Sequence, residues 1–434
     1  MLWAVVNPFG IVEIVSKKEE KMKTFTKTTI AFAVILALTI ALASCGGNSS
    51  PPASPTPPPE PAPTPAAPVT ESTEPEIADI DLVPSAAKTV EIADVMDNMP
   101  TPYIVPCPAG YENKVWELSL NDQTMEMQPL GMNEKDAARA IEARTNGQIK
   151  ITPYYNNTLL EQNNQWPGVV QGLADISIYT IDMNMGAQPQ HSVLNQPANL
   201  PYPANSDMVR AVREFAKNHP EFAAEDAAQG IHTLAYSYNP VTSFHMAKGV
   251  IKSQNDLKGK KIIGNASIKP YAEGLGATSI AMGPGEFYTA LEKGVADGLI
   301  THWVILRDSN MLDVFNSHTI LEKSTSGVNA TCLCFITNKD VWESIPPEYQ
   351  EVVTEMFNWV FSANSQYNDA VREVVIKDAQ SRGQEVVVLN AEESAPFFEN
   401  ARAAAQIWID KATGEGVTNA QQLYEDWMAE LSKY

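Results

Sequence analysis

Residues 114–122, KVWELSLND, alternate apolar and polar side chains, which predicts a strand with one buried face. Residues 131–147 follow with apolar positions at helical spacing and close on Asn146-Gly147, a pair that favours the end of a helix. A second strand is predicted over 148–157, a helix that ends at a glycine over 165–172, and a third strand over 175–183. This order indicates an α/β lobe with a mostly parallel sheet.

The same order returns between residues 256 and 303, where three short apolar runs alternate with two helical segments. VVQGLADISIY (169–179) and ALEKGVADGLI (290–300) both pass from a helix end through glycine and aspartate into an apolar strand. We therefore predict two lobes of similar local topology. The first comprises 114–239 with part of 330–370, and the second comprises 240–329 with part of 371–434.

Residues 347–382 contain no glycine and no internal proline, so they predict one continuous helix. At 1.5 Å per residue such a helix would be about 50 Å long. Because that length exceeds what one lobe can cover, we expect the helix to brace both lobes.

The N-terminal part has the pattern of a bacterial lipoprotein. Residues 22–44 begin with Lys23 and Lys27 and continue into an apolar run too short to span a membrane comfortably, which is typical of a signal peptide. Leu42-Ala43-Ser44-Cys45 matches the lipobox, which predicts cleavage before Cys45 and lipidation of its thiol. Residues 1–21 fit neither a signal nor a domain and are interpreted as a mis-annotated extension ahead of the true start.

Residues 45–113 are rich in proline, small polar residues and acids. Such a composition cannot bury much apolar area, so we predict an extended, solvated tether between the anchor and the folded part.

The formal net charge of −22 over 434 residues leaves no basic stripe, which argues against nucleic-acid binding. Nucleophile elbows, phosphate-binding loops, dinucleotide fingerprints and metalloprotease motifs are missing from the sequence, so no enzyme, cofactor or metal site is predicted. Cys332 and Cys334 lie on a strand-like run and are interpreted as core residues. A disulfide from Cys107 to one of them stays possible in an oxidising compartment.

Several motifs together resemble the solute-binding component of TRAP (tripartite ATP-independent periplasmic) transporters, the DctP-like family. The resemblance covers roughly residues 115–434 and is carried by ARAIEARTNGQIKITPYYNNTLLEQ, GVVQGLADISIY, DLKGKKI, LGATSIAMGPGEFYTALEKGVADG and IPPEYQEVV. It implies a two-lobed periplasmic-binding-protein-like α/β fold with hinge strands and a long bracing helix. It also implies that the protein captures a small solute outside the cytoplasm and delivers it to a membrane permease.

The sequence departs from the family pattern where an arginine usually grips the ligand carboxylate. That position is Ile263, a second family arginine is replaced near Ser243, and Thr301-His302-Trp303 stands where an asparagine is common. We therefore expect a neutral, aromatic or amide-bearing solute, unless His245, Lys269 or Arg307 supplies the missing charge.

The candidate ligand-binding residues follow strand ends or lie at the expected crossing between the lobes. His302 and Trp303 end one strand, so alternation places only one of them inward. Each candidate has a structural alternative in loop capping or core packing. The full set is Gln123, Tyr179, Thr180, Tyr236, Ile263, Asn265, Ser267, Pro284, Thr301, His302 and Trp303.

Two other functions stay open on the sequence. The first is a binding protein for another importer or for a sensor kinase, which a neighbouring permease gene would argue against. The second, a secreted α/β enzyme, would need a nucleophile or metal site that the sequence does not show.

Overall fold

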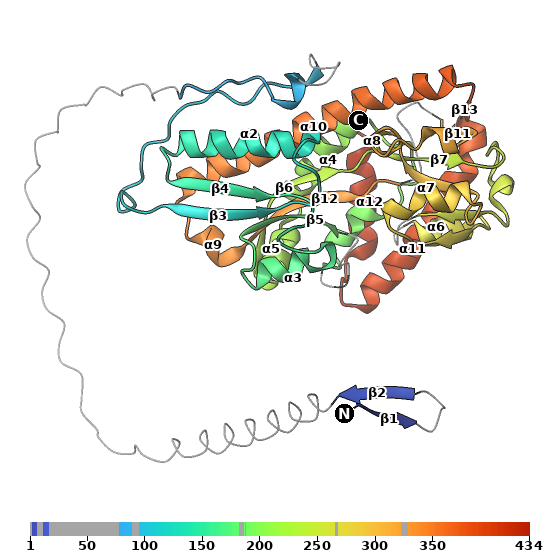
Figure 1. Ribbon diagram of the computed structural model, residues 1–434, viewed down its shortest axis with the longest axis horizontal. Coiled ribbons are helices and arrows are strands. Elements are labelled where there is room, and N and C mark those ends of the chain that lie inside the picture. Colours follow the sequence, from blue (N-terminus) through green and yellow to red (C-terminus); the bar gives the residue numbers. More distant parts are fainter. Residues whose placement is uncertain are drawn as a thin grey trace, which may run out of the picture. The chain divides into compact units, whose positions relative to one another are not determined.

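Figure 1 shows a computed structural model of the chain. It describes residues 2–6, 12–16, 78–88, 95–181, 186, 188–264, 268–322 and 329–434. The chain divides into two compact units, residues 1–71 and 72–434. In the first unit, β1 (Leu2–Val6) and β2 (Val12–Ser16) pair as an antiparallel ribbon. Cys45 and the signal-like segment lie outside the described residues.

The larger unit contains two sheets, one for each predicted lobe. The lobe I sheet has the order β4-β3-β5-β12-β6. β3 runs parallel to β4 and β5, whereas β12 lies antiparallel between β5 and β6. The strands are β3 (Trp116–Asn121), β4 (Ile149–Tyr154), β5 (Ile176–Thr180), β6 (Ile231–Tyr238) and β12 (Cys332–Asn338).

Helices cover the lobe I sheet and connect its strands. α2 ends where predicted, since Asn146 and Gly147 adopt positive φ of 51° and 77° after its last turn. The helices are α2 (Pro129–Arg144), α3 (Gln165–Val170), α4 (Asn205–Asn218), α5 (Pro220–Ala228) and α9 (Lys339–Glu343).

The lobe II sheet has the order β13-β11-β7-β10-β8-β9. β10, β8 and β9 run parallel, and β7 pairs antiparallel with both β10 and β11. The elements are β7 (Thr242–Met246), β8 (Lys261–Ile263), α6 (Lys269–Gly274), β9 (Thr278–Ile280), α7 (Pro284–Glu292), β10 (Gly298–His302), α8 (Trp303–Asp308), β11 (Ser317–Ile320) and β13 (Glu385–Val388). The predicted α/β, two-lobed fold is confirmed.

The predicted long helix is also confirmed. α10 (Pro347–Ser381) contacts α2, α4 and β6 of lobe I and α8 and β13 of lobe II, as Figure 1 shows for the orange helix. Its contact with the lobe I sheet includes Phe361, which stacks on Phe335 of β12 with ring centroids 4.4 Å apart. The helix therefore belongs to the cores of both lobes.

Two further helices follow β13. α11 (Ala391–Gly414) contacts α6 of lobe II and packs α12 (Ala420–Leu431) beside it. α12 returns to lobe I, where Trp427 stacks on Tyr238 at 5.9 Å. Lobe II therefore takes only part of residues 371–434.

The prediction of a solvated tether up to residue 113 does not hold for its C-terminal part. Ala86, Met99 and Val105 are buried in the lobe I core, and the Trp359 indole of α10 donates a hydrogen bond to the carbonyl of Asp97 at 3.1 Å. The reason is that apolar residues recur after residue 77, whereas the preceding stretch is dominated by proline.

The structure confirms that Cys332 and Cys334 are core residues, and it decides whether Cys107 forms a disulfide with one of them. Cys332 and Cys334 are buried in β12, and Cys107 is exposed. All three are free thiols, so the possible disulfide is not formed. Among the described residues, no helix combines the length and apolarity required to cross a membrane.

Replacing Phe361 with alanine tests the bracing role of α10. Phe361→Ala leaves a cavity between α10 and β12, so we expect a loss of about 3–5 kcal/mol of unfolding free energy, measured by urea titration. Val374→Ala, at a 42% exposed position of the same helix, should change stability by no more than about 0.5 kcal/mol. Equal effects of the two substitutions would contradict the brace.

Candidate functional site

A cavity of about 320 Å³ lies between the two lobes. Both lobes and the strands that connect them contribute to its wall. The lining residues are Gln123, Gln162 and Thr180 of lobe I; Asn239, Thr242 and Thr331 of the connections; and Gly264, Ile268, Met282, Gly283, Phe287, Leu299, Ile300, Thr301, His302 and Ile305 of lobe II.

The sheet topology explains why these residues meet. Gln123 and Thr180 lie at the carboxyl ends of the parallel strands β3 and β5, and Gly264 and His302 at those of β8 and β10. Carboxyl ends of parallel strands share one edge of a sheet, which is where α/β proteins bind ligands. The two sheets thus turn their corresponding edges towards one cavity.

His302 is the most specific hydrogen-bonding group of the wall. Its Nδ1 accepts a hydrogen bond from the backbone N–H of Ile305 at 3.3 Å, which caps α8. Burial lowers the pKa of His302 to about 4, so the ring is neutral near pH 7. With Nδ1 used as an acceptor, Nε2 carries the proton and offers a donor.

Gln123 supplies the complementary kind of group. Its Oε1 is buried and has no hydrogen-bond partner within the part of the chain that the structure describes. A buried carbonyl without a partner is costly, so a ligand donor that reached it would be bound favourably. No arginine, lysine, aspartate or glutamate is among the described residues that line the cavity.

The structure brings together four of the predicted site residues: Gln123, Thr180, Thr301 and His302 all line the cavity. Asn265 and Ser267 lie outside the described residues, although their neighbours Gly264 and Ile268 reach the wall. Pro284 begins α7 next to the lining residue Gly283, and its side chain is likewise outside the described part.

Ile263 does not line the cavity, contrary to the expectation from the sequence, and of the pair His302 and Trp303, of which one was expected to face inward, only His302 does. Trp303 is fully buried, and its indole donates to Ser243 Oγ at 3.1 Å. β10 ends at His302 and α8 begins at Trp303, so the two side chains belong to different elements. Ile263 is also fully buried and packs in the core of lobe II, so it presents no wall to a ligand.

Tyr179 and Tyr236 are core residues as well. Tyr179 packs on Trp166 with ring centroids 5.3 Å apart, while its neighbour Thr180 reaches the cavity. The Tyr236 hydroxyl lies 2.8 Å from His191 Nε2, and Glu225 contacts the opposite ring nitrogen at 2.7 Å. This buried network stabilises lobe I instead of forming the site.

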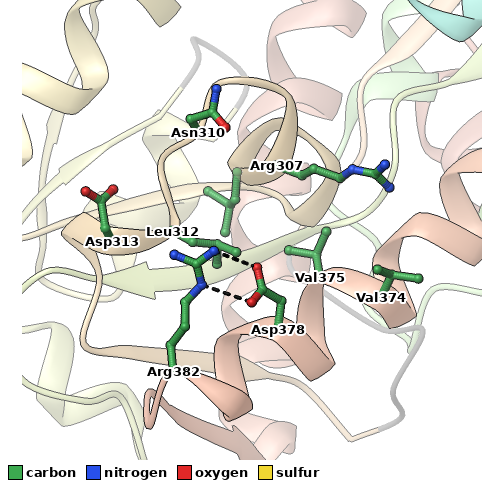
Figure 2. Close-up of a pocket in the computed structure, with 9 residues that line it drawn as sticks. Arg307, Asn310, Leu312, Asp313, Val374, Val375, Asp378 and Arg382 are labelled. Atoms are coloured by element: carbon green, nitrogen blue, oxygen red, sulfur yellow. Dashed lines mark hydrogen bonds and ion pairs between the residues drawn. The ribbon is translucent and has the colours of Figure 1, made fainter. Parts of the chain in front are cut away.

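None of the three proposed substitutes for the arginine lines the cavity. Lys269 is exposed and pairs with Glu273 along α6. Arg307 lies in a separate pocket on the α8 and α10 side, which Figure 2 shows together with the Arg382–Asp378 ion pair. His245 is buried behind the wall and donates towards the carbonyl of Thr301.

The connecting residues Asn239, Thr242 and Thr331 were missed, as was Gln162. Asn239 N–H donates to the Thr331 carbonyl at 2.9 Å and Thr242 N–H to the Asn329 carbonyl at 2.8 Å, which joins the two crossings between the lobes. The available signal was the short gap between two apolar runs at residues 231–246, which marks a strand changing sheets.

Two lobes that enclose a polar-lined cavity, with hinge connections and a shared helix, define a two-lobed binding protein for small molecules. Residues 120–411 match the model of the bacterial extracellular solute-binding protein family 7, and the chain belongs to that family. The family and the similar solved structures are solute-binding proteins and not enzymes.

Three similar proteins illustrate the relationship. The uncharacterized protein YiiZ of Salmonella typhimurium is 28% identical over 167 residues, which cover 36% of this chain and about half (48%) of that protein. A TRAP periplasmic solute-binding protein of Desulfovibrio salexigens superimposes with a TM-score of 0.65 at 21% identity, covering 74% of this chain and 96% of the other. A marine metagenome TRAP protein solved with 3-hydroxybenzoate has a TM-score of 0.65 at 23% identity, covering 74% and 99%.

A double-mutant cycle tests the structural role of Trp303. Trp303→Phe and Ser243→Ala each remove one partner of the buried hydrogen bond, so each should destabilise the fold by about 1–3 kcal/mol in urea titrations. Because the bond is lost only once, the loss of unfolding free energy in the double variant should be smaller than the sum of the two single losses by about 1 kcal/mol. Strict additivity would show that the two side chains do not interact.

Proposed function

We propose that this protein captures a small organic solute in the cavity between its lobes by neutral hydrogen bonds and delivers it to a TRAP-type permease. The observation that carries the proposal is the wall itself: hydrogen-bonding side chains stand at the carboxyl ends of three parallel strands, β3, β5 and β10, with no charged side chain in the described lining.

The polar groups predict a solute with both acceptors and donors. His302 Nε2–H suits a carbonyl, carboxyl or hydroxyl oxygen, and Gln123 Oε1 suits an N–H or O–H group. The wall also has apolar members, among them Ile268, Met282 and Phe287. This combination favours a planar or aromatic molecule with polar substituents at one end.

A dicarboxylate fits this wall poorly. Enclosing an ionised carboxylate without a cation or a sufficient set of donors costs several kcal/mol. The similar marine protein was solved with 3-hydroxybenzoate, a ring with one acid and one hydroxyl group, which supports an aromatic solute for this chain too. We expect the lobes to close on the solute through the crossings near Asn239 and Thr331.

Delivery and anchoring rest on the family and on the sequence. Solute-binding proteins of this family serve membrane permeases, and the lipobox at Cys45 would hold the protein at a membrane surface outside the cytoplasm. Delivery to another importer or to a sensor kinase would use the same cavity with a different partner.

His302→Asn separates the ligand contact of His302 from its capping role. An asparagine oxygen can accept from the Ile305 N–H as Nδ1 does, but it lacks the Nε2 donor. We expect unfolding free energy to change by less than about 1 kcal/mol and affinity for a bound solute to fall about 10- to 100-fold. The solute is first identified by mass spectrometry of what co-purifies, and affinity is then measured by calorimetry.

His232→Asn is the matched control, since His232 stacks on Trp342 at 4.8 Å in lobe I and does not line the cavity. It should leave the affinity unchanged. Full affinity in His302→Asn would rule out the proposed donor, and retention of no small molecule by the purified protein, in any screen, would argue against the function.

Cys45→Ala tests the anchor. With the thiol removed, no lipid can be attached, so the variant should move from the membrane fraction to the soluble extracytoplasmic fraction of the native host. Fractionation followed by mass spectrometry of the N-terminal peptide measures this. Identical distribution of the wild type and the variant would contradict lipidation.

A further inference from the structure

Two histidines face each other directly behind the cavity wall. His245 of β7 and His318 of β11 are opposite each other in the antiparallel pair, and both are fully buried. Their Nδ1 atoms are 2.7 Å apart, a hydrogen-bond distance. Neither ring lines the cavity itself.

The outer nitrogens of both rings face acceptors. His245 Nε2 is 3.1 Å from the carbonyl oxygen of Thr301, and His318 Nε2 is 2.9 Å from Gln384 Oε1. The Gln384 amide cannot simply be reversed, because its Nε2 donates to the Leu312 carbonyl. Both Nε2 atoms therefore have to carry protons.

The three hydrogen-bond contacts require three protons on the two rings. Two neutral imidazoles hold two N–H protons, and if both are on Nε2, two lone pairs confront each other between the Nδ1 atoms. Moving one proton inward leaves an outer nitrogen facing a carbonyl oxygen without a proton. Only three protons on the two rings satisfy all three contacts, which gives the pair one positive charge.

Burial opposes a positive charge on this pair, whereas the neighbouring aromatic rings favour it. Burial lowers the pKa of both rings, that of His318 to about 4, because the site is screened from water. Trp303 and Phe315 lie within 4.7–5.8 Å of the rings, as centroid distances, and aromatic neighbours stabilise a cation. The excess proton is therefore bound below the ordinary titration range of histidine and lost as the pH rises.

No carboxylate is paired with either ring among the described residues. β10 contributes the titratable His302, while α8 contributes Trp303 and the segment before β13 contributes the Gln384 amide, neither of which titrates. His302 is thus the competing explanation for any pH effect at the cavity.

We infer that His245 and His318 form a single proton-binding site that sets the charge preference of the cavity: when it holds its third proton, the cavity favours an anionic solute. The inference rests on the proposed function. The charge acts through one hydrogen bond, since the carbonyl that His245 contacts belongs to Thr301, which lines the cavity. Binding of an anion and of the proton must then strengthen each other reciprocally.

The test compares an acid with its amide. Calorimetry with 3-hydroxybenzoate and 3-hydroxybenzamide is run at pH 8 and pH 4 on the wild type, His318→Asn and His232→Asn. In the wild type and in His232→Asn, the affinity for the ionised acid should be about fivefold higher at pH 4, because the pair is then about half protonated and one buried charge at short range contributes about tenfold when fully present. Amide affinity should stay level, and a similar rise for the amide would overturn the inference.

His318→Asn removes the charge while it keeps the contact. The asparagine amide can donate to His245 Nδ1, so the remaining ring is satisfied without an extra proton. The pH effect on acid binding should disappear in this variant. If the effect persists there, His302 or the ligand is responsible and the inference fails.

A second measurement does not depend on any ligand. Nitrogen-15 NMR of labelled histidines, followed from pH 7 to pH 3.5, should show both rings protonated at Nε2 and one further proton shared between the Nδ1 atoms, taken up in a single step near pH 4. Rings that titrate independently, or a fixed neutral tautomer down to pH 3.5, would overturn the inference. Absence of binding by both compounds, with the shared proton observed, would count against the proposed solute class alone.

Discussion

The two crossings between the lobes govern the rest of the molecule. The backbone between β6 and β7 lies against the backbone before β12, and paired N–H and carbonyl groups join them at Asn239–Thr331 and Thr242–Asn329. These hydrogen bonds fix the position of the lobe I sheet relative to the lobe II sheet at the crossings. The strand ends that form the cavity are aligned because the chain crosses there, and α10 then closes the opposite side with a helix common to both cores.

The chemistry of the cavity follows from what its strands present. A wall of threonine, glutamine and a neutral histidine can discriminate by the direction of hydrogen bonds, since a donor facing a donor is rejected as strongly as a missing partner. Selectivity in such a site depends on rigid placement, and His302 is held rigidly because its own Nδ1 caps α8. The predicted absence of the family arginine would change the basis of recognition from charge to the direction of hydrogen bonds.

Helices and strands with strong hydrophobic periodicity could be predicted from the sequence, but the contacts between them, and therefore the residues that line the cavity, could not. Predicting α10 needed only the absence of glycine and of internal proline over residues 347–382, whereas predicting the site needed the residue at which each strand stops. The sequence left open which of His302 and Trp303 faces inward, because it does not show that α8 starts at Trp303. Tyr179 was misplaced because β5 is buried along its whole length, so that alternation carries no information there. The cavity contribution of Asn239 and Thr331 depends on a crossing of distant segments, which a local pattern cannot reveal. Asn265, Ser267 and the lipidation of Cys45 stay predictions.

Both ends of the folded unit are attached to lobe I. Val105 N–H donates to the Arg144 carbonyl at the end of α2, and the last helix, α12, packs against α4, so both ends are fastened to lobe I. Within the described residues, the chain passes between lobe I and lobe II at the two crossings and through α10 and α11. An anchor at Cys45, as the sequence predicts, would therefore hold lobe I, and the proposed closure of lobe II over a solute would leave the predicted tether in place.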